Sequence, residues 1–332
     1  MVLGEDDDGR RADRIVRKAL RNVPLSTIYR LFRQGNVHVE NHSIKPEDRL
    51  KKGEIIKISL PEALIAAKTG EATDAPPRAI SALKSEFNGL LNHEMPQIVW
   101  QNEHLIAFHK PRGMLVHDGE TSLDAYALSV LRDQLPHSVS FSPGPLHRLD
   151  RNTSGIIMFS KTRIGAEKFT AAIRNRQIRK FYISIVQGDA LEPLLIQDTL
   201  LRDTQKHVSI IDKKGKTASL YIVPLIKNGR YSLLLIELHT GITHQIRAQL
   251  AAHGLPLAGD SKYGGQKTSN IRYYFLHSYC LYLRSQLFGD MPSKIIDPLS
   301  EDFYTMIMTL FDTNPEKLEA GIFQVMKQLL EN

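Results

Sequence analysis

The chain has 332 residues, of which 42% are hydrophobic and 24% are charged, a composition typical of folded globular proteins. No stretch approaches the roughly 18 uninterrupted apolar residues of a membrane helix, and the start, MVLGEDDDGRRADR, lacks the apolar segment of a secretory signal. We therefore expect a cytoplasmic protein. The single cysteine, Cys280, excludes an intrachain disulfide, and its apolar surroundings (YYFLHSYCLYL) predict a buried, inert thiol.

Positive charge is concentrated near the beginning of the chain. The net charge is +7, yet residues 10–60 hold 13 Lys and Arg against five acidic residues, so this block carries +8 and the remainder −1. A basic block of this kind is typical of a surface that binds a phosphate backbone. A solvated charged face without a ligand is the alternative interpretation.

The elements expected in this block are two helices followed by a hairpin. ADRIVRKAL and LSTIYRLFRQG have apolar residues at helical spacing, with Ser26 as N-cap and Gly35 as the stop of the second helix. VHVEN and EIIKISL predict short strands joined by a polar loop. With RxDRxxxxxL, YRLFRQGNVHVEN and the ending KxGxxI, the block resembles the S-four type of RNA-binding module, first described in a small-subunit ribosomal protein. That resemblance implies RNA contacts by Arg14, Arg17, Arg30, Arg33, Lys51 and Lys52.

Residues 61–95 are interpreted as a linker, with a short helix near Ile80 to Leu91. Residues 96–290 mix strand and helix patterns and predict an α+β domain built on a mainly antiparallel sheet with flanking helices. The expected elements are a hairpin over 97–111, helices over 122–135, 163–177 and 243–254, and strands over 155–161, 179–188, 231–241 and 273–283. Thr243 is the expected N-cap of the helix that stops at Gly254. Residues 291–332 predict a helical extension that is broken near Pro315.

Several classes of chemistry lack their motifs in this sequence. There is no GxGxxG, GxxxxGK[ST], GxSxG or HExxH, so nucleotide-cofactor, serine-hydrolase and zinc-protease sites are not indicated. Asp150, in LHRLDRNTSG, is not directly followed by Thr/Ser-Gly, as an aspartic protease requires. What remains is one aspartate placed between Arg148 and Arg151.

Four stretches in order decide between the remaining interpretations. HKPRGMLVHDG, LHRLDRNTSGIIMFSKT, RKFYISIVQG and HTGITHQIRAQLAAHGLPLAGDSKYGG occur between residues 109 and 265. Together they resemble the RluA-type pseudouridine synthases over roughly residues 96–290. One departure is Ile242, where the family commonly has an arginine.

The resemblance implies a reaction that needs one carboxylate and neither a cofactor nor a metal. Such an enzyme breaks the bond between uracil and ribose, turns the base and rejoins it through a ring carbon. Positive charge develops on the sugar, so an ionised carboxylate, Asp150, is the essential group, as nucleophile or as base on the sugar. Arg247 matches the family's partner arginine, which keeps that carboxylate charged, and Tyr182 matches the tyrosine that packs on uracil.

Arg148 matches the side chain that fills the space left by a flipped base. Arg151 is expected to point elsewhere. The resemblance also gives candidate substrate contacts, with Thr153 expected foremost to shape the turn: His147, Thr153, His244 and Gln245.

The expected partner is structured RNA, with large-subunit ribosomal RNA favoured over transfer RNA because an accessory module is typical of the ribosomal modifiers of the family. We expect a monomer without an obligate protein partner. Two rival functions stay open at this point. A non-catalytic RNA-binding protein would not need Asp150, Tyr182 and Arg247 together, and a base-excising glycosidase would need a second acid and would release free uracil.

Overall fold

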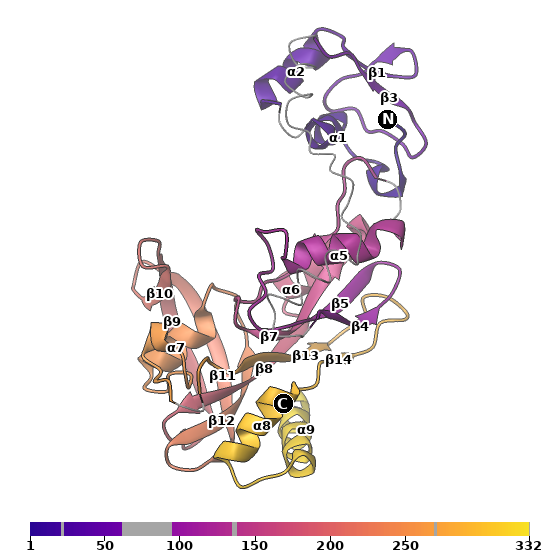
Figure 1. Ribbon diagram of the computed structural model, residues 1–332. Helices are drawn as coiled ribbons and strands as arrows, with labels where there is room; N and C mark the ends of the chain where they lie inside the picture. Colours follow the sequence, from indigo (N-terminus) through magenta and orange to yellow (C-terminus); the bar gives the residue numbers. More distant parts are fainter. Residues whose placement is uncertain (21–22, 62–94, 135–137, 269–270, 332) are drawn as a thin grey trace.

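The computed structural model describes residues 1–20, 23–61, 95–134, 138–268 and 271–331. The helix expected near Ile80 to Leu91, and nearly all of the expected linker, lie outside the described residues. An N-terminal unit stands at one end of the molecule, and the C-terminal helices lie at the other (Figure 1). Among the described residues, no helix is both long and apolar enough to cross a membrane.

The N-terminal unit contains the predicted two helices and hairpin. Helices α1 (Ala12–Ala19) and α2 (Leu25–Arg33) pack beside a three-stranded antiparallel sheet, with β1 (Val37–Val39) between β2 (His42–Ser43) and β3 (Ile56–Ile58). Gly35, with φ of 68°, follows the end of α2 as predicted. The predicted N-cap Ser26 is wrong, because α2 begins at Leu25 and Pro24 precedes it.

Residues 1–3 also belong to this unit, outside the expected 10–60 block. The backbone amide of Leu3 donates to Glu54, Val2 forms a bridge with Ile55, and the Leu3 side chain is buried in the unit's core. Ile15 and Ile28 complete that core from α1 and α2. The apolar faces of the two helices therefore cover the small sheet, while their arginines face outward.

The remainder of the chain is built on one eleven-stranded mixed sheet, which confirms the predicted α+β class. Its order is β10-β9-β11-β12-β8-β13-β7-β5-β4, with β14 beside β13 and β6 beside β7. Strands β7 and β13 are parallel, and the other pairings among the described residues are antiparallel. The strands are β4 (Gln97–Gln101), β5 (Leu105–Lys110), β6 (Gly144–Pro145), β7 (Ser154–Ser160), β8 (Ile178–Gln187), β9 (Leu194–Asp203), β10 (Val208–Ile211), β11 (Lys216–Lys227), β12 (Tyr231–Leu238), β13 (Leu276–Leu283) and β14 (Lys294–Ile296).

Helices cover both faces of this sheet, because alternate residues of its central strands are apolar on each side. On β5, Phe108 points to the cluster that contains α5 (Leu123–Leu131), and Ala107 points to the cluster that contains α6 (Arg163–Arg174). Helices α8 (Glu301–Leu310) and α9 (Pro315–Glu331) pack on β8, β12 and β13 through residues such as Phe303 and Ile322. The predicted C-terminal helices therefore share a core with the sheet.

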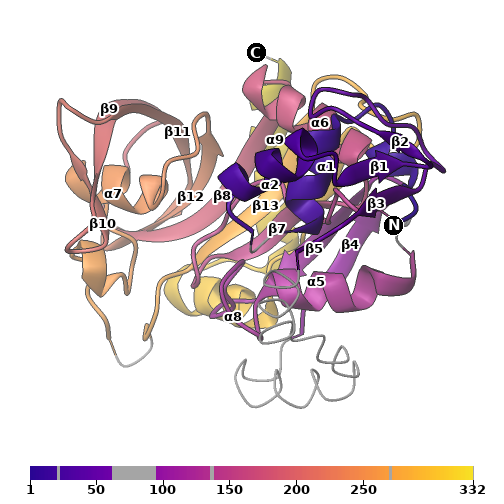
Figure 2. The same cartoon turned by 90° about the horizontal axis from the view of Figure 1, so that it is seen from above.

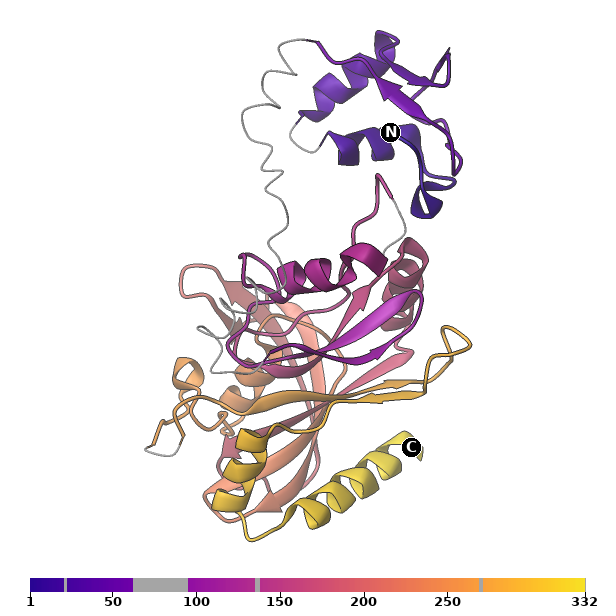
Figure 3. The ribbon, with the colours of Figure 1, turned by 45° about the vertical axis from the view of Figure 1, so that its right-hand side comes forward.

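The sheet divides into two halves around β8 and β13. One half holds β9 to β12 with α7 (Gln245–Ala252), and the other holds β4, β5 and β7 with α5 and α6 (Figure 2). The N-terminal unit lies beyond the second half, opposite the C-terminal helices (Figure 3). The middle of the sheet is the place where segments from both halves meet.

Candidate active site

A pocket of about 870 Å³ opens where the two halves of the sheet meet. Its walls come from the loop before β7, the first half of β8, and the segment from the end of β12 to the start of α7. Asp150, Tyr182 and Arg247 all line it. Three stretches that are far apart in the sequence thus supply one cavity, which has the size of a small-ligand site.

Asp150 faces a buried cation. Its Oδ2 accepts a hydrogen bond from Nη1 of Arg247 at 3.1 Å, while the other side of this guanidinium makes a bidentate pair with Asp260 at 2.7 and 2.8 Å. The guanidinium also lies over the rings of Tyr274 and Tyr263, at 4.6 and 4.9 Å. Burial disfavours the charge of Arg247, but the hydrogen bonds to Asp260 and the electrostatic attraction of Tyr274, Asp260 and Asp150 together outweigh burial and raise its pKa. Asp260 and the two tyrosine rings hold the guanidinium of Arg247 in one orientation. The charged arginine therefore orients Asp150.

The turn before β7 presents Asp150 to the pocket. The amide of Thr153 donates to the carbonyl of Asp150 at 3.1 Å and closes this turn. Gly155 follows with φ of 108°, and a Cβ there would lie 2.4 Å from the Ser278 carbonyl oxygen of β13. Only glycine allows this close parallel approach. The residues TSG thus shape the turn, as expected for Thr153, whose side chain is buried.

A buried lysine fixes the same turn from behind. The Nζ of Lys110, at the end of β5, donates to the carbonyls of Pro111, Met114 and Arg151. Arg151 is tied further to Gly113, because its Nε donates to that carbonyl and its own carbonyl accepts from the Gly113 amide. Arg151 therefore points away from the pocket, and its guanidinium holds the loop of the HKPRG stretch.

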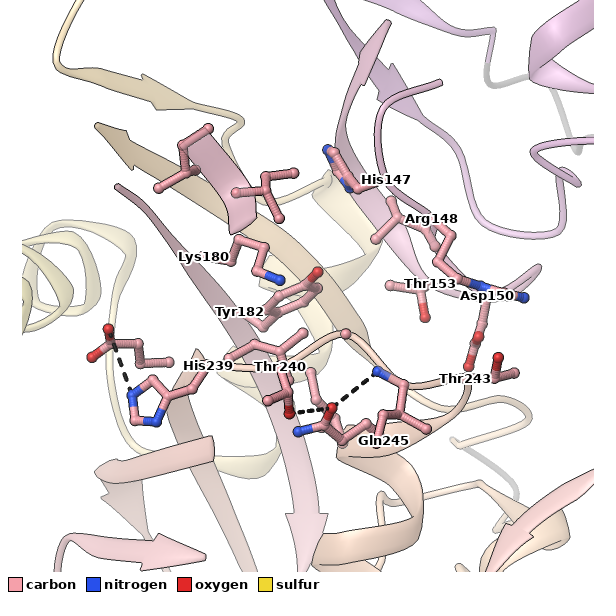
Figure 4. Close-up of a pocket in the computed structure, with 18 of the residues that line it drawn as sticks. His147, Arg148, Asp150, Thr153, Lys180, Tyr182, His239, Thr240, Thr243 and Gln245 are labelled. Carbon is pink, nitrogen blue, oxygen red and sulfur yellow. Dashed lines mark hydrogen bonds and ion pairs between the residues drawn. The ribbon is translucent and has the colours of Figure 1, made fainter. Parts of the chain in front are cut away.

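Tyr182 and Lys180 extend from β8 into the pocket, since residues two apart share one face of a strand (Figure 4). Burial raises the pKa of Tyr182 to about 12, so its hydroxyl is protonated at neutral pH. Burial lowers the pKa of the Lys180 ammonium. The wall opposite Asp150 thus carries a neutral phenol and a partly desolvated cation.

His244 occupies a left-handed backbone conformation, with φ of 57°, directly before α7. It is the N-cap of that helix, so the predicted N-cap Thr243 is wrong by one residue, whereas Gly254 follows the helix end as predicted, with φ of 78°. A non-glycine residue in this region is strained, which is typical of functional sites.

Hydrogen bonds determine which nitrogen of His244 carries the proton. Burial lowers the pKa of its imidazole to about 4, so the ring is neutral at neutral pH. The Tyr263 hydroxyl lies 2.8 Å from Nδ1 of His244. Nη1 of Arg202, which can only donate, also lies 3.5 Å from Nδ1, so Nδ1 is the acceptor. The remaining proton is therefore on Nε2, which lies 3.9 Å from Asp150 Oδ2. At this distance Nε2 and Oδ2 are not hydrogen-bonded.

The other expected substrate contacts differ in whether their polar atoms already form hydrogen bonds within the protein. Arg148 is exposed and lines the pocket rim. Nε2 of His147 accepts from the Met158 amide, which ties this ring to β7, and burial lowers its pKa to about 3. Gln245 accepts from Thr240 and Ile242 and donates to Ser219 and Gln249. The Gln245 side chain therefore stabilises residues 240–242 of the pocket wall, and its polar atoms already have partners within the protein.

The expected RNA contacts of the basic block lie outside this pocket, on the surface of the N-terminal unit. Six side chains are exposed there: Arg14, Arg17, Arg30, Arg33, Lys51 and Lys52. Lys52 forms an ion pair with Glu5, which is also exposed. The unit thus presents cations to solvent on its helices and on the loop before β3.

Sequence reasoning did not assign roles to Lys110, Asp260 or Tyr274. Lys110 stands in the HKPRG stretch and Asp260 in GDSKYGG, two of the stretches that carry the family resemblance. Their types and positions gave no sign that one holds the Asp150 turn and the other holds Arg247. Among the described residues, the structure also groups no three metal-ligating side chains that could hold an ion.

Comparisons with known proteins identify the family to which the chain is similar. Residues 104–252 match the family described as RNA pseudouridylate synthase. The chain is 31% identical over 284 residues to "Ribosomal large subunit pseudouridine synthase C" of Vibrio cholerae serotype O1, covering 83% of this chain and 85% of the relative. The protein of the same name from Haemophilus influenzae is 31% identical over 291 residues, 85% of each chain.

A solved structure shows the same fold. That of human RNA pseudouridylate synthase domain containing 4 superposes with a TM-score of 0.55 at 19% identity, over 70% of this chain and 97% of the human one. The level of identity to the bacterial relatives, over most of both chains, establishes the resemblance first suggested by the four sequence stretches. The chain belongs to the RNA pseudouridylate synthase family.

Proposed function

We propose that the protein converts specific uridines of large-subunit ribosomal RNA into pseudouridine, with Asp150 as its catalytic group. The observation that carries this proposal is the Asp150 carboxylate, held 3.1 Å from the buried Arg247 in a pocket that also contains Tyr182. Charge on the ribose develops next to this carboxylate when the glycosidic bond breaks. The reaction is an isomerisation, so every atom of the uridine is kept.

Each group of the pocket has a part in this scheme. Arg247 holds Asp150 aimed at the ribose through the hydrogen bond to its Oδ2. The ring of Tyr182 packs on uracil, and its hydroxyl enters the reaction protonated, as a hydrogen-bond donor. Lys180 and residues 239–244, which line the pocket, enclose the base while it turns. A second acid is not needed, because uracil leaves as a stabilised anion and stays bound.

The RNA must release a stacked base before this chemistry begins. Arg148, exposed at the pocket rim two residues before Asp150, is placed to enter the stack and offset the loss of base stacking. The exposed cations of the N-terminal unit supply binding to phosphates, in keeping with the resemblance to the S-four type of module. These features support a large structured RNA as the substrate.

Ribosomal RNA is favoured by the names of the bacterial relatives, each a ribosomal large subunit pseudouridine synthase. Transfer RNA remains the second candidate substrate. We further propose a monomer that acts in the cytoplasm without an obligate protein partner, because one chain supplies Asp150, Tyr182 and Arg247 to a single pocket.

Incubation of the purified protein with large-subunit ribosomal RNA and with transfer RNA, followed by nucleoside analysis, tests the proposal. We expect pseudouridine in the ribosomal RNA and no free uracil. Free uracil would indicate a base-excising glycosidase, and unchanged nucleosides with tight binding would indicate a non-catalytic RNA-binding protein. Pseudouridine in transfer RNA alone would correct the substrate and leave the reaction in place.

A further inference from the structure

The N-terminal unit is joined to the catalytic domain by a buried carboxylate. Asp7, in the short helix η1 (Glu5–Asp7) before α1, is fully buried. Its Oδ1 accepts from the Ser138 hydroxyl at 2.9 Å and from the amide and hydroxyl of Ser140 at 2.8 and 2.5 Å, and its Oδ2 accepts from the Val139 amide at 2.9 Å. One carboxylate thus gathers four donors from a loop about 130 residues away in the sequence.

Two further contacts flank this carboxylate. Nη1 of Arg10 donates to both the carbonyl and the hydroxyl oxygen of Ser140, each at 2.9 Å. Asp6 Oδ1 accepts from the Arg163 amide at 2.8 Å, and the Arg163 guanidinium donates to the Asp6 carbonyl. We call the contact of residues 6, 7 and 10 with residues 138–140 and 163 the docking contact. It is polar, specific in geometry and shielded from water.

An apolar contact accompanies these hydrogen bonds. Val139 of the catalytic domain packs against the core of the N-terminal unit, a cluster that includes Leu3. Burial disfavours the charge of Asp7, but hydrogen bonds from Ser140, Val139 and Gly4 together outweigh burial and lower its pKa. The acidic stretch EDDD therefore contributes Asp6 and Asp7 to an interface between the two parts of the chain. It precedes the basic block and has the opposite charge.

The docking contact is rigidly connected to the catalytic turn. Residues 138–140 lead into β6, which pairs with β7, and Arg163 begins the helix that follows β7. Asp150 stands four residues before Ser154, at which the same strand begins. The two anchor points of the N-terminal unit therefore lie on either side of β7 in the sequence, and Figure 3 shows the loop that rises from the catalytic domain toward the unit.

We propose that Asp7 is a positioning residue that holds the basic N-terminal unit at a fixed place relative to Asp150, so that RNA bound by the unit presents one particular uridine to the pocket. This inference rests on the proposed function. A unit joined by chain connectivity alone could sample many positions, and each would deliver a different part of a large RNA to the pocket. The docking contact selects one of them before RNA binds.

The expected consequence is a loss that depends on the size of the substrate. With Asp7→Asn, the amide NH₂ would face either the three donors of Ser138 and Ser140 or the amides of Val139 and Gly4, and the docking contact would open. We expect kcat/KM for whole large-subunit ribosomal RNA to fall about tenfold through KM, because the bound RNA then reaches the pocket at a lower effective concentration. A short hairpin around the same uridine, which needs only the pocket, should be modified within about twofold of the wild-type rate.

The test compares the wild type and four full-length variants on both RNAs. Asp8→Asn is the matched control, because the change in charge is the same. Its side chain accepts from the Lys52 amide within the N-terminal unit, and the contact of Asp8 with Arg163 uses the backbone carbonyl, which the substitution keeps. Ser140→Ala opens the contact from the catalytic side and leaves the N-terminal sequence unchanged, which separates docking from folding of the unit. The double variant of Asp7 and Ser140 should lose less than the two single losses combined.

Small-angle scattering supplies a readout that does not depend on RNA. Asp7→Asn and Ser140→Ala should both increase the radius of gyration, whereas Asp8→Asn should not. Equal losses of rate on the hairpin and on the whole RNA, or no loss on the whole RNA, would overturn the proposal. Absence of pseudouridine from the wild-type reaction on either RNA would instead contradict the proposed function, so the two failures can be told apart.

Discussion

The pocket and the N-terminal unit both hold arginines, but they use them differently. In the pocket, the Arg247 side chain is 7% exposed and is bonded to two carboxylates. In the N-terminal unit, Arg14, Arg17, Arg30 and Arg33 are exposed to solvent. A buried, doubly paired arginine has one orientation and can serve chemistry, whereas exposed arginines can follow a phosphate backbone of variable shape. We infer that the pocket determines rate and the N-terminal unit determines affinity.

The largest effect should follow from removing the charge of the pocket's carboxylate. Asp150→Asn keeps the shape of the side chain but cannot stabilise positive charge on the ribose, so no pseudouridine should form, while RNA affinity changes by no more than a few-fold. Quench-flow detection of product, together with filter binding, measures both. Turnover by the purified variant would show that another group performs the chemistry.

Arg247→Met should reduce the rate by about 10³-fold or more, because it removes the cation that orients Asp150 and leaves Asp260 buried without its partner. Arg151→Ala is the matched control, since that guanidinium donates to the Gly113 carbonyl and points away from the pocket. Single-turnover rates on a short RNA would compare the two. Equal losses would mean that the wrong arginine has been assigned to Asp150.

Lys110→Met should lower the rate about 10-fold to 100-fold by releasing three carbonyls that fix the Asp150 turn, since a shift of about 1 Å in a reacting group has effects of this size. Lys161→Met, which loses a comparable bond to the Asn102 carbonyl away from the pocket, serves as control. Rates are compared at a temperature at which circular dichroism shows both variants folded. An unchanged rate for Lys110→Met would show that the turn keeps its conformation without the hydrogen bonds from Lys110.

The smallest effect on rate should come from the N-terminal unit. Arg30→Ala with Arg33→Ala should leave the rate at saturating RNA unchanged and lower the slope of log affinity against log salt by about 1.5, since each phosphate contact contributes about 0.7 to 0.9. Lys317→Ala with Lys327→Ala removes the same charge from α9, at the opposite end of the molecule, and should leave the slope unchanged. Equal slopes in the wild type and both double variants would show that the basic block is a solvated surface that does not bind the RNA phosphates.

Sequence reasoning performed best where the pattern was local. The strands and helices around Asp150 have apolar residues at regular spacing, and the structure has them where they were expected. The sequence pattern predicted no strand between residues 188 and 231, yet β9, β10 and β11 lie there. These strands are near the edge of the sheet, so exposed residues such as Leu194 and Leu195 interrupt the alternation, and Pro224 stands inside β11 at a register shift.

The site divides in a similar way. Asp150, Arg247 and Tyr182 could be placed together only through the family resemblance, because their separation in the sequence contains no sign of contact. The supporting groups could not be found at all. Lys110 and Asp260 act through hydrogen bonds to other segments of the chain. The docking contact joins residues 6, 7 and 10 to residues 138–140 and 163, and no pattern in the sequence links residues so far apart.

The most direct test of a pocket that determines rate and a unit that determines affinity is a single-turnover measurement at saturating enzyme on whole large-subunit ribosomal RNA. The Arg30→Ala and Arg33→Ala protein should reach the wild-type rate once its weaker binding is saturated, and Asp150→Asn should give no product at any concentration. A saturated rate that falls with the two arginines would contradict this division, because it would place part of the rate-determining machinery in the N-terminal unit.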